Sequence, residues 1–105
     1  MNSLRIVEDL RKRTFKSLIE TFILAELNDD PLSGYDVNGL IHKRFDVVVS
    51  PGTIYSLLYS LERDGLIKGA QERNRRVYTL TEEGKKNKEV IKKVNEEIQE
   101  FLGRI

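Results

Sequence analysis

The segment from Ser50 to Gly65 constrains the fold of this 105-residue chain more than any other. Ser50 is a favoured N-cap residue, Pro51 suits the first helical position, and Gly65 suits the residue just past a helix end. At about 100° per residue, one side of such a helix carries only aliphatic residues, Ile54, Leu57, Leu58 and Leu61. The opposite side carries Gly52, Ser56, Tyr59 and Arg63, with Tyr55 on its flank. This pattern predicts a short helix that buries one face and offers a polar, aromatic and cationic face to a partner.

Two further helices are predicted ahead of this segment. The first spans residues 4 to about 28, where apolar residues recur at three-and-four spacing, and Thr14 leaves open whether it is broken into two. The turn residues Asn28-Asp29-Asp30-Pro31 end it. Ser33 caps the second helix, about 34–45, which we expect to bury Tyr35, Val37, Leu40 and Ile41.

Two short strands and a long helix are predicted after it. The strands cover Leu66 to about Glu72 and Arg76 to Leu80, joined by the polar turn Arg73-Asn74-Arg75, and Tyr78 is expected in the core. Thr81 caps the last helix, which reaches the C-terminus. Its apolar residues recur every three or four positions, at Ile91, Val94, Ile98, Phe101 or Leu102, and Ile105.

The order of these elements predicts a mainly α fold with a small β-hairpin, a winged helix-turn-helix with an additional C-terminal helix. We expect residues 1–80 to form the DNA-binding domain and residues 81–105 the dimerisation helix. The apolar stripe of the last helix can pack on its own subunit or on a partner. A helix of about 20 residues is about 30 Å long, so its far half stays uncovered unless a second copy packs on it, which favours a homodimer.

Composition excludes several classes of function. The chain has no cysteine and a single histidine, His42, so thiolate chemistry and the usual metal-ligand motifs are absent, and we expect no metal, no cofactor and no enzyme activity. No apolar stretch is long enough to cross a bilayer, so a cytoplasmic protein without membrane contact is expected. Although the net charge is only +1, residues 43–76 carry seven basic against four acidic residues, as a phosphate-binding face requires.

Three stretches of the chain resemble the PadR-like family of transcriptional regulators. They are Gly34-Tyr35-Asp36-Val37, the run from Val49 through Ser50-Pro51-Gly52-Thr53-Ile54-Tyr55 to Ile67, and Arg76 to Gly84. The resemblance implies a homodimeric, repressor-type regulator whose third helix and wing bind operator DNA. It also implies that the C-terminal helix, together with the N-terminal helix at Leu4 and Val7, forms the dimer interface. The chain has no tryptophan, so it lacks the residues with which some members stack aromatic drugs.

The candidate DNA contacts lie on the third helix, the wing and the end of the second helix: Lys43, Ser50, Gly52, Thr53, Tyr55, Ser56, Tyr59, Arg73, Arg75 and Arg76. Ser50 can instead act only as a cap, and the two tyrosines can instead pack in the core. Alternation along the strand places Arg75 and Arg76 on opposite faces, so both are not expected to contact DNA equally. A basic cluster on the first helix, Arg11, Lys12, Arg13 and Lys16, is a further set of candidate phosphate contacts.

The sequence therefore predicts a regulator that binds a palindromic operator as a homodimer, with room for a small apolar effector where the helices of two copies meet. The alternative is a winged-helix module that docks proteins and does not bind DNA. The two differ in whether Ser56, Tyr59 and Arg63 face solvent or another protein.

Overall fold

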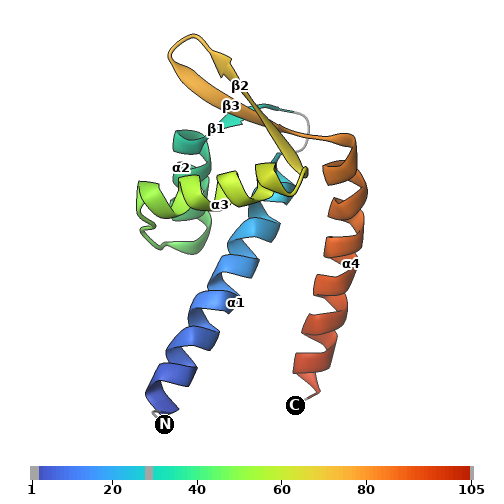
Figure 1. The fold of residues 1–105 in the computed structure, drawn as a ribbon. Helices are drawn as coiled ribbons and strands as arrows, with labels where there is room; N and C mark the ends of the chain where they lie inside the picture. Colours follow the sequence, from blue (N-terminus) through green and yellow to red (C-terminus); the bar gives the residue numbers. More distant parts are fainter. Residues whose placement is uncertain (1–2, 28–29, 105) are drawn as a thin grey trace.

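The computed structural model describes residues 3–27 and 30–104. Its elements follow the predicted order, three helices, a hairpin and a trailing helix, with one short additional strand (Figure 1). They are α1 (Ser3–Glu26), β1 (Leu32–Ser33), α2 (Gly34–Phe45), α3 (Pro51–Arg63), β2 (Ile67–Glu72), β3 (Arg75–Leu80) and α4 (Glu82–Gly103). The winged helix-turn-helix fold is confirmed. Asn28 and Asp29 of the predicted turn, and Ile105 of the last apolar stripe, lie outside the described residues.

The core lies where the second half of α1 meets α2, α3 and the base of the hairpin. The predicted aliphatic face of α3 is buried, with Ile54 and Leu58 fully inaccessible to solvent. It packs against Ile19, Ile23, Leu24 and Leu27 of α1 and its C-terminal end, Val37 and Ile41 of α2, and Ile67, Tyr78 and Leu80 of the strands. Burial of Tyr78, as expected from the strand pattern, is confirmed. This core fixes the opposite face of α3 on the outside of the molecule.

Helix α1 is continuous through Thr14, which settles the point that the sequence left open. Helix α2 differs from prediction at two positions, because Leu40 is only half-buried and Tyr35 is open to solvent. Tyr35 was expected to be buried and is 84% exposed. The buried positions of α2 are Gly34, Val37 and Ile41, spaced three and four apart, and Tyr35 lies about 100° around the helix from Gly34, outside that stripe.

The hairpin is part of a three-stranded antiparallel sheet in the order β1-β3-β2. The strand β1 was missed, because two residues are too few to show an alternating pattern. It pairs Leu32 with Tyr78 and Ser33 with Val77, and so connects the start of α2 to the wing. Strand β3 begins at Arg75, opposite Glu72, one residue earlier than predicted. Val77 and Tyr78 of the middle strand β3 are both buried, although their side chains point to opposite faces of the sheet.

Two helix ends project from this body. The molecule measures 48 × 28 × 26 Å, and its long dimension comes from the first half of α1 and the second half of α4, which point the same way (Figure 1). The beginning of α4 is held firmly: Thr81 donates its hydroxyl to the carbonyl of Gly65 at 2.6 Å and its backbone N–H to that of Leu66 at 3.1 Å. Beyond Ile91, which packs against the core, the apolar residues of α4 are exposed.

Candidate nucleic-acid interface

Helix α3 carries most of the predicted DNA contacts on its open face. Ser50 is the N-cap: its hydroxyl accepts the Thr53 N–H at 3.2 Å and lies 2.8 Å from the Thr53 hydroxyl. Gly52, Thr53, Ser56 and Tyr59 are all exposed on the face that the core leaves free. Capping therefore uses part of the hydrogen-bonding capacity of the Ser50 hydroxyl. The first two turns of α3 present small and hydroxyl-bearing side chains to solvent.

Tyr55 connects α3 to the start of α2. Its ring lies so close to Gly34 that a Cβ at that position would stand 2.6 Å from the ring. Half of the Tyr55 surface remains open, so the residue is neither a core tyrosine nor a freely rotating one. This contact fixes the ring between the two helices of the helix-turn-helix. Tyr59, one turn later, is more exposed and faces outward with Ser56.

Arg76 is held against the base of the wing. Its Nη2 donates to Glu62 Oε2 at 2.9 Å, and the same oxygen accepts the Gly69 N–H at 3.1 Å. The guanidinium lies directly over Gly69, where any Cβ would overlap it, and 5.8 Å from the centroid of the Tyr78 ring. One carboxylate on the last turn of α3 thus holds both strands of the hairpin. Glu62, which sequence reasoning missed, sets the position of the wing relative to α3.

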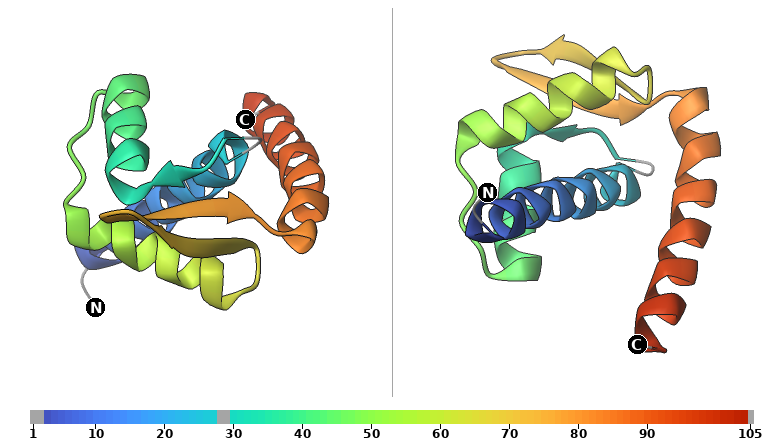
Figure 2. Two further views of the ribbon diagram at one scale, coloured as in Figure 1. Left: turned by 90° about the horizontal axis from the view of Figure 1, so that it is seen from above. Right: turned by 60° about the horizontal axis from the view of Figure 1, so that its bottom comes forward.

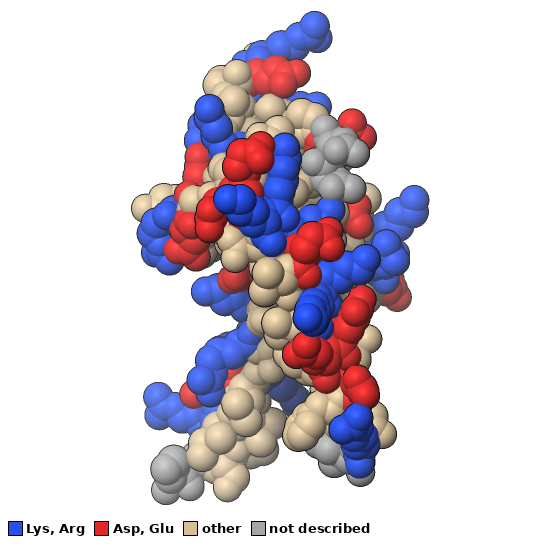
Figure 3. All heavy atoms as spheres, turned by 90° about the vertical axis from the view of Figure 1, so that its right-hand side faces the viewer, with Lys and Arg blue, Asp and Glu red and all other residues tan. Residues whose placement is uncertain are grey.

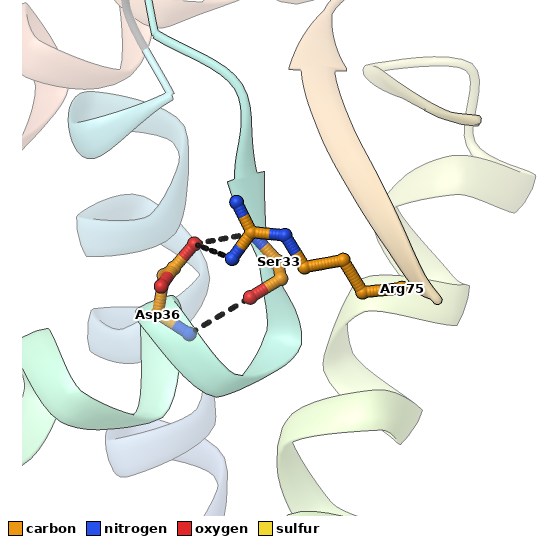
Figure 4. A network of polar contacts seen from close by, with 3 residues as sticks. All are labelled: Ser33, Asp36 and Arg75. Atoms are coloured by element: carbon orange, nitrogen blue, oxygen red, sulfur yellow. Dashed lines mark hydrogen bonds and ion pairs between the residues drawn. The ribbon is translucent and has the colours of Figure 1, made fainter. Parts of the chain in front are cut away.

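Arg75 points to the other side, toward α2 (Figure 4). Its Nη1 lies 3.3 Å from Asp36 Oδ2, which also accepts the Ser33 backbone N–H at 3.0 Å. In return the Ser33 hydroxyl accepts the Asp36 N–H, which completes a capping box. The Ser33 N–H bond is the main cause that holds the pKa of Asp36 below its ordinary value, and the Arg75 charge adds to it. The predicted opposite orientation of Arg75 and Arg76 agrees with these two separate partners.

Arg73 is the cation at the tip of the wing. It has a φ of 57°, in the left-handed region, where the chain reverses between β2 and β3. Within the described residues no ion pair involves its guanidinium, in contrast to Arg75 and Arg76. Lys43 is also exposed, in the last turn of α2, and no hydrogen bond or ion pair joins its side chain to the described residues of α3 or the wing. The arrangement therefore offers one unpaired arginine at the tip and two paired ones behind it.

Burial acts on one more group near the wing. Removal from solvent raises the pKa of the Tyr78 hydroxyl, and the neighbouring Arg76 charge opposes that effect. Tyr78 thus belongs to the core beneath the hairpin, and the polar surface consists of the side chains around it.

Neither a metal site nor a membrane-spanning helix is found among the described residues. They contain no group of three His, Asp or Glu side chains that could hold a metal ion. None of the helices in residues 3–27 and 30–104 is long and apolar enough to cross a membrane.

Comparison with known proteins identifies the family. Residues 23–90 match the transcriptional regulator PadR-like family, and this range includes α2, α3 and the whole wing. The chain belongs to the PadR-like family. The family is one of transcriptional regulators.

Solved structures agree with this assignment. A transcriptional regulator from Clostridium thermocellum has a TM-score of 0.79 at 26% identity, covering 89% of this chain and 97% of that one. Bacillus subtilis PadR in complex with operator DNA has a TM-score of 0.58 at 25% identity, covering 69% of this chain and 46% of that one. Both comparisons support a PadR-like arrangement of helices and wing.

One curated relative has a different description. Riboflavin kinase of Pyrococcus furiosus is 45% identical over 56 residues, which cover 53% of this chain and 25% of that protein. The chain thus spans about a quarter of the length of this relative. The similarity is confined to 56 residues, a stretch that is part of a larger protein, and the name riboflavin kinase describes that larger protein.

Proposed function

We propose that this PadR-like regulator binds double-stranded DNA as a homodimer and represses transcription from a palindromic operator in the cytoplasm. The observation that carries the proposal is the solvent-facing side of α3, which has Gly52, Ser56 and Tyr59 exposed beside an arginine-tipped wing. A helix with this outline fits the major groove, which is about 12 Å wide. The B. subtilis PadR neighbour, solved in complex with operator DNA, supports binding to DNA.

The proposed contacts divide by chemistry. Small side chains at Gly52 and Ser56 let α3 approach base edges, whereas Ser50, Thr53, Tyr55 and Tyr59 supply hydroxyl groups for phosphates. Arg73 reaches the DNA backbone or a minor groove from the wing tip. Arg75 contacts the DNA as well when its ion pair with Asp36 opens. Arg76 acts by positioning the wing, because its guanidinium is held by Glu62, whose same oxygen also accepts the Gly69 N–H. Lys43 contributes a phosphate contact at the end of α2.

Dimerisation covers the two projecting helix ends. The apolar residues there are exposed. On α1 the exposed fraction is 71% for Leu4 and 42% for Val7, and on α4 it is 63% for Phe101 and somewhat less for Val94, Ile98 and Leu102. Figure 3, which faces α4, shows charges of both signs from the top of this side to its lower tips, with uncharged patches between them at the lower ends. We place residues 81–105 in the dimer interface, where α1 and α4 of two copies cover each other, and Ile91 connects this stripe to the core. Two α3 helices would then lie about one DNA turn, roughly 34 Å, apart.

A small apolar effector has room beside this interface. A hollow of about 290 Å³ lies between α1, α3 and α4, with Leu24, Leu61, Ile91, Val94 and Ile98 among its lining residues. Because Val94 and Ile98 also belong to the proposed dimer face, an apolar occupant would change how the two copies pack. That coupling offers a route from effector binding to release of DNA.

Salt dependence of binding tests the DNA interface. Binding of the protein to duplex fragments is measured by fluorescence anisotropy across a series of salt concentrations, and we expect log K to fall linearly with log salt, by about 0.9 for each phosphate that the protein neutralises. Arg73→Ala removes one phosphate contact from each subunit, so it should lower the slope of the dimer by about 2 and weaken binding to all sequences alike. Arg76→Ala should weaken binding through the position of the wing, with Arg76→Lys restoring little of it because Lys lacks the planar donor fork.

Lys86→Ala, which removes an exposed cation of α4, is the matched control, and its slope should equal that of the unaltered protein. Absence of salt-dependent affinity for any duplex would rule out the proposed function and favour a protein-docking module.

A further inference from the structure

The basic cluster on α1 has no role in the interface described so far. A helix places Lys12 and Lys16, four residues apart, on one face. Arg11 lies about 100° away from Lys12 and lines a different, apolar hollow together with Val7 and Leu18. Lys12 and Lys16 therefore share a face of α1 that turns toward α3, whereas Arg11 lies on another face.

Lys12 and Lys16 line an open hollow with the first turns of α3. The hollow has a volume of about 750 Å³, and its α3 side consists of Ser50, Gly52, Thr53, Ser56 and Leu57. Phe15 of α1 and the exposed Val48 of the preceding link complete the wall. The fold thus brings two lysines next to four of the proposed DNA contacts, although they are distant in sequence.

The charges around this hollow are of one sign. None of its lining residues is acidic, and Lys12 and Lys16 are the only charged side chains among them. Lys16 lies 3.8 Å from Glu20 and is more than half exposed, so this ion pair is weak and leaves the ammonium group accessible. An anionic partner at the N-terminal end of α3 would meet both lysines without displacing a buried contact.

The arrangement of the elements favours the DNA backbone as that partner. In Figure 1 the wing lies on one side of α3 and the N-terminal half of α1 on the other. Seen from above in Figure 2, this half of α1 comes forward to the side of the molecule that α3 occupies. A duplex lying along the open face of α3 and touching the wing would therefore pass α1 at its opposite edge.

We propose that Lys12 and Lys16 bind phosphates of the same duplex that α3 contacts, on the side of α3 away from the wing. This proposal rests on the proposed function and extends the interface to α1. Lysine suits the role, because its compact charge on a flexible stem neutralises a phosphate without fixing a base sequence. In a homodimer these lysines contact the backbone toward the centre of the operator, and the wings contact it at the outer ends.

The test compares two pairs of lysines in the full chain. Lys12→Ala/Lys16→Ala should reduce the slope of log K against log salt by about 0.9 for each phosphate that is no longer neutralised, and weaken binding to unrelated duplexes by the same factor. Lys12→Arg/Lys16→Arg should restore the slope. The control, Lys86→Ala/Lys93→Ala, removes two exposed lysines from α4, which stands at the opposite edge of the molecule from the start of α3. Its slope should not change.

Four outcomes separate the possible roles of these lysines. An unchanged slope for the Lys12/Lys16 pair, with normal binding by the unaltered protein, overturns this inference and leaves the proposed function standing. Equal decreases for both lysine pairs also overturn it, since they show a general charge effect. Dissociation of the dimer in sedimentation, with the slope unchanged at saturating protein, assigns the hollow to a protein contact. Failure of the unaltered protein to bind any duplex removes the proposed function itself.

Discussion

Helices α3 and α4 look alike in sequence and differ in what covers them. Each has an aliphatic stripe at three-and-four spacing beside a polar face. In α3 the stripe is buried within the same chain, and Leu58 has no exposed surface. In α4 the stripe beyond Ile91 is open, with Val94 43% and Phe101 63% exposed. A periodic pattern therefore shows that a helix has an apolar face, and the packing of the whole chain decides whether that face belongs to a core or to a surface.

Truncation in the α3 stripe should have the largest effect on stability. We expect Leu58→Ala to lower the free energy of unfolding by about 2–5 kcal/mol, because it leaves a cavity among fully buried neighbours. Urea unfolding followed by circular dichroism, at one protein concentration for all variants, measures the change. Ser56→Ala on the open face is the control and should stay within about 0.5 kcal/mol. Similar decreases for both would contradict the division of α3 into a core face and a free face.

Much of the fold could be predicted from the sequence because its signals are local. The Ser50-Pro51 start, the Gly65 end and the aliphatic spacing of α3 act within a few residues, and the structure agrees with them. The formation of strand β1 and the exposure of Tyr35 depend on which parts of the molecule β3 and α1 leave uncovered. No local sequence pattern contains this information. The same holds for the candidate site: the exposed side of α3 was predicted, whereas the Glu62–Arg76 pair joins residues 14 apart and Asp36–Arg75 joins residues 39 apart.

The second prediction compares the two ends of α4. Gly84 lies against the Leu66 carbonyl oxygen, and a Cβ there would overlap that backbone atom. We expect Gly84→Ala to cost about 3 kcal/mol, the upper end of the range for overpacking, because neither backbone segment can move aside easily. Gly103→Ala, where no atom lies within 4 Å, should change stability by less than about 1 kcal/mol. Equal effects in thermal unfolding would contradict a helix that is fixed at its beginning and open at its end.

The third prediction concerns the open stripe itself and is smaller per side chain. Ile98 is 49% exposed in the single chain, so its partner can bury about half of its surface. That burial is worth roughly 1 kcal/mol for each copy, since complete burial of such a side chain contributes about 1.5–3 kcal/mol. Ile98→Asp should therefore raise the dimer dissociation constant at least about 30-fold, from two copies at about 1.4 kcal/mol per factor of ten. Lys93→Asp introduces the same side chain on the opposite face of α4 and should leave the constant nearly unchanged. Sedimentation equilibrium measures both. An Ile98→Asp protein that unfolds at all concentrations, instead of giving a folded monomer, would show that α4 belongs to the core as α3 does, and would remove the difference between the two helices.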